Sequence, residues 1–411
     1  MNSLLIKNIS RLITMESGAG RKGPLGVIED ACVLIEAGKI SWLGKLEQLN
    51  LKDRKKYQEL DAKEAVVTPG LVECHTHLVH AGSRHSEFKQ RCEGVSYWEI
   101  TNQGGGIMST VRATRQAQEQ ELFESAFERG NQALKNGITT LEIKSGYGLD
   151  EATELKILKV IQKLNTEHCL DFYPTFLGAH VVPPEYKDQP EDYVNLVCEQ
   201  MLPQIAQQGL AKACDVFVEK GAFSIEQGFK ICTVAKSYGL DIRLHVDQFE
   251  DSRGALLAAE LEAKAADHLE YVCKKGIEAM KASGVVAVVL PGATFFVGNK
   301  EYAPARQMIE RGVTVAISTD YNPGTNSCLN LILTGTIAAT QMQLTLDEVW
   351  AGITINAAKA LGLEEEIGSI AIGKKADLTF FDSPDEYYPF YCYDQNLVKM
   401  VIKNGKIAYN S

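Results

Sequence analysis

Apolar and polar positions follow two different periods in the middle of this chain. Apolar or β-branched runs recur between residues 66 and 318, and segments with helical periodicity separate most of them. The eight runs are 66–74, 139–144, 170–176, 212–219, 241–246, 265–268, 285–290 and 313–318. Strand–helix alternation repeated in this way predicts an α/β fold, a parallel (β/α)8 barrel of the TIM type. A doubly wound open sheet is the competing arrangement.

The clearest helical pattern lies between the second and third runs, over residues 151–166. Leu155, Leu158, Ile161 and Leu164 share one side of that helix, and Asp150 stands where an N-cap residue belongs. Similar patterns predict helices near 121–135, 191–208, 224–238, 274–282, 301–311 and 328–343.

One connection is unusually long, because about 45 residues separate the first run from the next clear helix. It contains Gly104-Gly105-Gly106, but no Gly-Lys-Ser or Gly-Lys-Thr follows, so a phosphate-binding loop is not indicated. Long connections in compact domains are typically functional, and we expect this one, over residues 80–120, to act as a lid.

The two ends of the chain resemble each other and differ from the middle. Short β-like runs occur at Ser3–Ile6, Ala31–Glu36 and Lys39–Leu43, and again at Ala376–Phe381 and Leu397–Lys403. Neither end has enough apolar sequence for a core of its own. We therefore expect residues 1–65 and 363–411 to form one composite β-domain beside a barrel of residues 66–362.

Composition excludes several classes of protein. The chain has 411 residues, of which 45% are apolar and 23% charged, as in ordinary globular proteins. Its net charge of −11 argues against nucleic acid and anionic membranes as partners. The longest apolar run, Val285–Leu290, is too short to span a bilayer, and the N-terminus lacks a signal-peptide pattern. Ten cysteines without Cys-x-x-Cys spacing fit a reducing cytoplasm.

Histidines gather where the predicted strands end. His75 and His77 follow the first run, and His180, His245 and His268 end the third, fifth and sixth, while Asp320 follows the eighth. Carboxyl ends of barrel strands meet on one face, so these side chains converge. His75, His77, His245 and Asp320 would form a site of three imidazoles and a carboxylate. Such a site suits Zn(II), with Fe or Mn also compatible, and it leaves a position open for an activated water.

Several motifs carry a resemblance to a known family. They are Cys74-His75-Thr76-His77-Leu78-Val79, Lys144-Ser145-Gly146-Tyr147-Gly148-Leu149, Phe176-Leu177-Gly178-Ala179-His180 and Asp320-Tyr321-Asn322-Pro323-Gly324-Thr325. The sequence resembles the amidohydrolase superfamily and, within it, the imidazolonepropionase family. The match runs from about residue 66 to 362 and includes the flanking β-domain. It implies a distorted barrel, a homodimer, and hydrolysis of 4-imidazolone-5-propanoate to N-formimino-L-glutamate in histidine degradation.

The resemblance also implies roles for individual residues. The family's metal ligands fall on His75, His77, His245 and Asp320. Its substrate contacts fall on Arg84, Tyr147, His180, Asn322, Gly324, Thr325 and Gln248, and Tyr97 is a further candidate in the long connection. Some members of the family have an acidic residue at the position of Gln248. A glutamine cannot exchange a proton as a carboxylate does, but it can hydrogen-bond the substrate ring or order a water.

The expected mechanism assigns proton transfer and polarisation to separate groups. His268 polarises the lactam carbonyl, and Asp320 moves the attacking water's proton to the leaving nitrogen. Arg84 has the planar fork that matches the substrate carboxylate. Relatives with two metal ions commonly use a bridging, carboxylated lysine at the end of the fourth strand. Here Lys220 points to the opposite side from Glu219 if that strand continues, so we expect a single metal ion. A mononuclear deaminase of a heterocycle and a non-enzymatic scaffold on the same fold are the alternatives.

Overall fold

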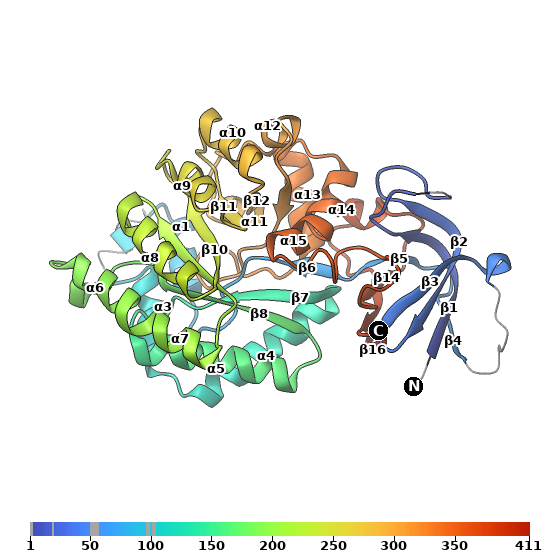
Figure 1. The fold of residues 1–411 in the computed structure, drawn as a ribbon, viewed down its shortest axis with the longest axis horizontal. Coiled ribbons are helices and arrows are strands. Elements are labelled where there is room, and N and C mark those ends of the chain that lie inside the picture. The colour runs from blue at the N-terminus through green and yellow to red at the C-terminus, as the bar shows by residue number, and fades with distance from the viewer. Residues whose placement is uncertain (1–2, 19, 50–56, 96–98, 101–103) are drawn as a thin grey trace.

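Eight parallel strands form one of two sheets in the computed structural model, which describes residues 3–18, 20–49, 57–95, 99–100 and 104–411. The strands are adjacent in chain order, as Figure 1 shows: β6 (Leu71–Glu73), β7 (Ile138–Lys144), β8 (Asp171–Ala179), β9 (Ala213–Val218), β10 (Asp241–Val246), β11 (Ala265–His268), β12 (Val286–Val289) and β13 (Val315–Ile317). Each run predicted as a barrel strand therefore contributes one, and the barrel prediction is confirmed.

The first and last strands are joined by contacts beyond their ends. Thr76 and Tyr321 form an isolated parallel bridge, and the His77 N–H donates to the Tyr321 carbonyl at 2.8 Å. The buried Glu73 carboxylate accepts from the Ser318 hydroxyl and from the Thr319 N–H. These contacts nearly close the barrel, which rules out the open doubly wound sheet.

Helices cover the outside of the barrel (Figure 1). Those following the strands are α4 (Glu119–Lys135), α5 (Glu151–Glu167), α6 (Pro190–Leu196), α7 (Leu202–Gln208), α8 (Ile225–Ser237), α9 (Gly254–Glu260), α10 (Lys274–Ser283), α11 (Pro291–Phe296), α12 (Ala305–Glu310), α13 (Leu331–Met342), α14 (Leu346–Gly352) and α15 (Ile355–Ala360). Asp150 caps α5 as predicted, with its carboxylate accepting from the Thr153 N–H at 2.7 Å. A π-helical turn, Val197–Met201, joins α6 to α7. None of the helices in the described residues is long and apolar enough to cross a membrane.

The long connection after the first strand contains helices that the sequence pattern did not reveal. These are α1 (His85–Cys92) and α3 (Ile107–Gln116). Helix α1 buries none of its residues, so it lacks the apolar stripe that would have predicted it. Helix α3 buries only Thr110, Val111 and Thr114. The lid role of this segment stays a prediction.

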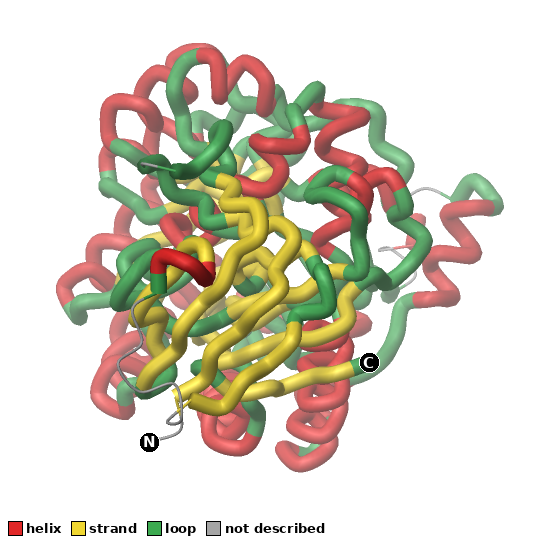
Figure 2. The backbone as a smooth tube through the Cα atoms, turned by 90° about the vertical axis from the view of Figure 1, so that its right-hand side faces the viewer, coloured by secondary structure: helices red, strands yellow, loops and turns green. Residues whose placement is uncertain are grey.

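Strands from both ends of the chain form the second sheet, which faces the viewer in Figure 2. Its order is β16 (Lys406–Asn410), β15 (Val398–Lys403), β14 (Leu378–Phe381), β5 (Val66–Pro69), β1 (Ser3–Ile13), β2 (Val27–Glu36) and β3 (Lys39–Lys45), with β4 (Tyr57–Asp61) also pairing with β1. A short helix, α16 (Tyr388–Tyr391), lies between β14 and β15 in the sequence. The ends of the chain therefore do combine into one sheet.

The run 66–74, predicted as one strand, is two strands that belong to different sheets. Val66–Pro69 pairs with β1 and β14, and the chain enters the barrel only after Gly70. A Cβ at Gly70 would lie 2.2 Å from the Thr139 hydroxyl oxygen, so this crossing point requires glycine. Continuous apolar character hid the break, because both halves are buried.

A buried lysine ties the terminal sheet to the barrel. The Lys403 ammonium on β15 lies 2.6 Å from the Asp377 carboxylate and 2.8 Å from that of Asp171, the first residue of β8. The Lys403 side chain is only 2% exposed. Removal of a buried charge partner leaves its carboxylate uncompensated.

We predict that Lys403→Met lowers the free energy of unfolding by about 3 kcal/mol. The matched control on the same strand is Lys399→Met, because Lys399 is 55% exposed and pairs with Asp382 at the surface. That control should change stability by less than about 1 kcal/mol. Urea denaturation measures both variants, and equal effects would contradict the linking role of Lys403.

Candidate metal and active site

Imidazoles and a carboxylate meet at the carboxyl ends of the barrel strands. His75 Nε2 lies 3.5 Å and His77 Nε2 3.7 Å from the same oxygen of Asp320, Oδ1. The His245 ring lies 4.6 Å from that of His75 and 5.6 Å from that of His77, between centroids. All four side chains are buried. The four predicted ligands therefore lie together, although they come from positions as far apart as 75 and 320.

His268 joins this group from the end of β11. Its ring centroid is 5.3 Å from that of His245 and 5.7 Å from that of His75. Possible ligand atoms lie close enough to share an ion in two overlapping sets, His75–His77–Asp320 and His75–His245–His268. His75 belongs to both sets and marks the centre of the site.

Two carboxylates fix the direction in which the central imidazoles point. His75 Nδ1 lies 2.8 Å from Asp267, and His245 Nδ1 lies 3.0 Å from Asp215. Carboxylates accept, so each Nδ1 carries the proton and each Nε2 presents a lone pair. Both Nε2 atoms are buried and have no hydrogen-bond partner among the described residues. A bound metal ion requires nitrogen lone pairs that no hydrogen bond uses, on rings that carboxylates hold in place. His75 and His245 both offer such a lone pair, so they fit a metal ion.

Charge states agree with this interpretation. Burial lowers the pKa of His75 and of His77 well below the usual value, which keeps both imidazoles neutral, as metal ligands must be. Burial raises the pKa of Asp320 to about 6, because a carboxylate is costly away from water. A bound cation would offset that cost and favour the ionised ligand.

The carboxylates of Asp215 and Asp267 belong to a buried network of ion pairs. The Lys144 ammonium lies 2.7 Å from Asp215, 3.1 Å from Asp267 and 2.9 Å from Glu142. Arg243 lies 3.0 Å from Glu142 and 3.4 Å from Asp267, and its guanidinium also donates to the Cys74 carbonyl. Burial raises the pKa of both aspartates. For Asp267, Arg243 and Lys144 outweigh burial and lower its pKa below the ordinary range. For Asp215, His245 and Lys144 have the same effect. The two aspartates therefore stay ionised.

Sequence reasoning did not identify Asp215, Glu142 or Arg243 as functional. A signal was present, because each is a charged residue inside a run predicted as a buried strand from its apolar or β-branched residues. Charges are almost never fully buried unless they are paired, so such positions indicate an internal network.

Asp320 is held from two sides by the loop that follows it. Its Oδ1 accepts from the Asn322 amide at 3.0 Å and its Oδ2 from the Thr325 hydroxyl at 3.3 Å. The side-chain oxygen of Asn322, Oδ1, in turn accepts from the N–H groups of Gly324 and Thr325 at 2.8 Å. Asn322 and Thr325, predicted as substrate contacts, thus also orient the carboxylate, while their contact with substrate stays a prediction.

His268 occupies a strained backbone position. Its φ is +79° and that of Leu269 is +71°, in the left-handed region that non-glycine residues rarely adopt. The Glu270 carboxylate lies 3.8 Å from His268 Nδ1. Burial lowers the pKa of His268, but Glu270 and Asp320 outweigh it and raise that pKa above its usual value. Glu270 was not identified from the sequence, since one acidic residue after a strand is common.

Tyr147 and His180 lie beside the predicted metal ligands. The His180 ring stacks on that of His77 at a centroid distance of 5.2 Å, and the Tyr147 ring lies 5.6 Å from it. Gln248 follows β10, and its backbone N–H donates to the Glu219 carboxylate at 2.8 Å. Tyr97 lies outside the described residues.

Arg84 packs against the loop that carries Gly324. A Cβ at Gly324 would lie 2.0 Å from Arg84 Nη1, so only glycine allows this approach. Arg84 Nε donates to Glu87 at 2.8 Å, and Glu87 also accepts from the Gly106 N–H at 3.0 Å. Arg84 is thus linked to the glycine-rich part of the long connection.

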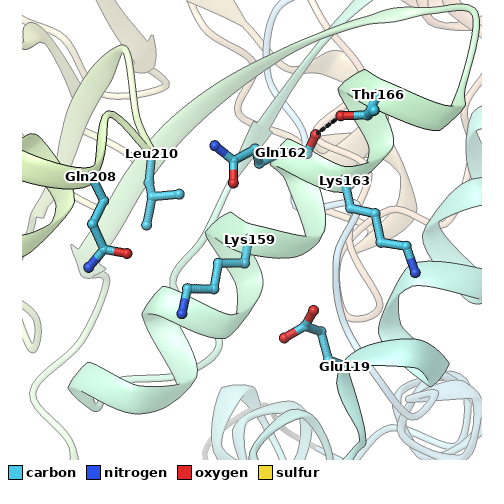
Figure 3. A pocket seen from close by; sticks show the side chains of 7 residues that line it. All are labelled: Glu119, Lys159, Gln162, Lys163, Thr166, Gln208 and Leu210. Carbon is cyan, nitrogen blue, oxygen red and sulfur yellow. Dashed lines mark hydrogen bonds between the residues drawn. The ribbon is translucent and has the colours of Figure 1, made fainter.

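A separate hollow lies on the outside of the barrel, between α4, α5 and the residues that follow α7 (Figure 3). Its volume is about 690 Å³, and its lining combines Glu119, Lys159 and Lys163 with neutral side chains. Its lining contains neither histidine nor cysteine.

The comparisons with known proteins agree with this geometry. Residues 66–408 match the model of the amidohydrolase family. Imidazolonepropionase from Alkaliphilus metalliredigens is 44% identical over 99% of this chain and 98% of its own length. Imidazolonepropionase from Shewanella baltica is 44% identical over 94% of this chain and 95% of its own. The chain belongs to the imidazolonepropionase family of amidohydrolases.

Solved structures confirm the fold at much lower identity. A 5-methylcytosine deaminase from Klebsiella pneumoniae matches with a TM-score of 0.76 at 16% identity, covering 99% of this chain and 98% of its own. An atrazine chlorohydrolase from Arthrobacter aurescens, complexed with zinc, matches with a TM-score of 0.71 at 18% identity, over 98% and 94%. The barrel and its composite sheet are therefore shared with enzymes named for different substrates. Family membership in turn makes the chain a metal-dependent hydrolase acting on a small molecule.

We predict that Asp215→Asn lowers metal affinity about 10- to 100-fold, because the amide NH2 would face either the Lys144 ammonium or His245. Metal content after dialysis against a graded series of chelator concentrations measures this effect. The control is Asp241→Asn, because Asp241 lies at the opposite end of β10 and is partly exposed. Equal metal retention in both variants would show that Asp215 does not support the ligand.

Proposed function

We propose that this protein hydrolyses 4-imidazolone-5-propanoate to N-formimino-L-glutamate. The observation that carries the proposal is the pair of orphaned Nε2 atoms of His75 and His245, where His75 also lies close to His77 and Asp320. Family membership supplies the substrate, since relatives at 44% identity are named for this reaction. A deaminase shares the fold but has no such support here.

One metal ion would be held by His75, His77, His245 and Asp320. When bound, it supplies a water of lowered pKa and polarises the substrate carbonyl, chemistry suited to Zn(II) or Fe. A second ion is not favoured, because the other cluster among the described residues, Asp215–His245–Asp267, already contacts the Lys144 ammonium. That fixed cation neutralises the carboxylates that a second ion would need.

Two side chains carry the proton movements and the polarisation. His268 donates a hydrogen bond to the lactam carbonyl, and Glu270 behind it favours the protonated imidazole. Asp320 accepts a proton from the attacking water and passes it to the ring nitrogen that leaves. Asn322 and Thr325 hold the carboxylate in place during that transfer.

The remaining candidates bind and orient the substrate. Arg84 forms a bidentate pair with the propanoate, beside the N–H groups of Gly324 and Thr325. Tyr147 and His180 contact the ring, with Tyr97 as a further candidate, and Gln248 hydrogen-bonds the ring or orders a water. We also propose that the protein acts as a homodimer in the cytoplasm.

We predict that Asp320→Ala removes nearly all turnover, because the variant loses both a ligand and the proton carrier. Formation of formiminoglutamate is measured beside release of ammonia with purified, metal-reconstituted protein. Ammonia without formiminoglutamate from the wild type would indicate a deaminase, and near-wild-type turnover in the variant would refute the proton-transfer role.

For Arg84→Ala we expect a different kinetic signature. KM for imidazolonepropanoate should rise about 100-fold, while kcat changes less than about tenfold, because the lost ion pair binds substrate and transition state alike. Lys89→Ala is the control, since Lys89 is 77% exposed on α1, the helix that begins directly after Arg84. An unchanged KM in the Arg84 variant would move the carboxylate contact elsewhere.

A further inference from the structure

The loop between β7 and α5 is held by one buried carboxylate. Glu154, on the first turn of α5 and fully buried, accepts from three backbone N–H groups of that loop. Its Oε2 lies 3.0 Å from the Gly146 nitrogen, and its Oε1 lies 2.7 Å from that of Gly148 and 2.9 Å from that of Leu149. The loop carries Tyr147 between these attachment points.

The same anchor reaches His180 through Gly146. The Gly146 carbonyl lies 3.1 Å from His180 Nδ1, and since a carbonyl only accepts, Nδ1 carries the proton. His180 Nε2 is therefore an acceptor. The rings of Tyr147 and His180 lie 5.8 Å apart. One carboxylate thus controls the position of one proposed substrate contact and the tautomer of another.

Other contacts leave this loop little freedom to move. Arg115 of α3 donates to the carbonyls of Gly148 and Leu149 at 2.7 and 3.2 Å. Gly146 has a φ of +101°, and a Cβ there would lie 2.9 Å from the Leu177 carbonyl oxygen. Arg115 thus holds the Gly148–Leu149 end of the loop, whereas Glu154 holds the Gly146 N–H, so a change at Glu154 acts on the Gly146 end and on the His180 ring bonded to it.

We infer that Glu154 is a positioning residue, which acts on the substrate only through Tyr147 and His180. The inference rests on the proposed function, because the substrate contacts of both rings belong to it. In Glu154→Gln, the amide oxygen still accepts from Gly148 and Leu149, but the NH2 group faces the Gly146 N–H. Gly146 moves away, and the hydrogen bond to His180 is lost.

The first test compares Glu154→Gln with Glu167→Gln, a matched change at the exposed end of the same helix. Glu154→Gln should lower kcat/KM for imidazolonepropanoate about 100-fold, while the control changes less than about twofold. Metal content should match the wild type in both, since the proposed ligands are untouched. Amide hydrogen exchange over residues 146–149 should quicken about tenfold or more in Glu154→Gln alone.

Coupling to His180 separates positioning from general destabilisation. We compare the factor by which Glu154→Gln lowers kcat/KM in two backgrounds. With His180→Ala already present, that factor should be less than about a third of the factor seen in the wild type, because the group that Glu154 positions is gone. Equal factors in both backgrounds, or unchanged exchange, would overturn the inference. If Glu154→Gln does not fold, Arg115→Gln loosens the same loop from its partly exposed side and must show the same coupling. If the wild type does not turn over imidazolonepropanoate, the proposed function fails, while hydrogen exchange still tests the anchor.

Discussion

The contact of the Lys144 ammonium with Asp215 and Asp267 is the interaction on which the site depends. Those two carboxylates determine which nitrogen of His245 and His75 carries the proton, and hence where both lone pairs point. The carboxylates of Asp215 and Asp267 stay ionised beside the imidazoles, because the Lys144 ammonium contacts both and Arg243 also contacts Asp267. Burying a charge costs free energy of desolvation unless the charge is paired. Removing one partner therefore leaves an uncompensated buried charge and destabilises the protein. The arrangement favours a cation above it, which is the physical reason that the orphaned nitrogens fit a metal ion.

Barrel geometry makes such a network possible. Side chains alternate along each strand, so Glu142 and Lys144 on β7, and Arg243 and His245 on β10, point into the barrel from successive levels. The register places Arg243 beside Asp215 and His245 beside Asp267 on the neighbouring strands. The fully buried lower level consists of ion pairs, and the upper level presents imidazoles. The loops after the strands then add Asp320 and His180, which are held by hydrogen bonds, and Tyr147, whose neighbours Gly146 and Gly148 donate to Glu154.

Prediction from sequence succeeded where a periodic pattern and burial coincide. The barrel strands, the cap at Asp150 and the joining of both termini in one sheet all follow from local apolar patterns and short turns. It failed at Gly70, where uninterrupted apolar character conceals a change of sheet, and between residues 85 and 116, where α1 buries none of its residues and α3 has only ten residues. Their helical form depends on contacts such as those of Glu87 with Arg84 and Gly106, which are not local patterns.

The sequence by itself determined the kind of barrel, the family, and which histidines and aspartate stand at strand ends. Residue type and alternation are sufficient for this, because parallel strands bring their carboxyl ends to one face whatever their order in the chain. Only the tertiary structure decided which nitrogen of each imidazole is presented, that Lys144 occupies the neighbouring carboxylate cluster, and that Glu154 anchors the Tyr147 loop. Those facts depend on distances between atoms far apart in sequence, and a linear pattern does not contain such distances.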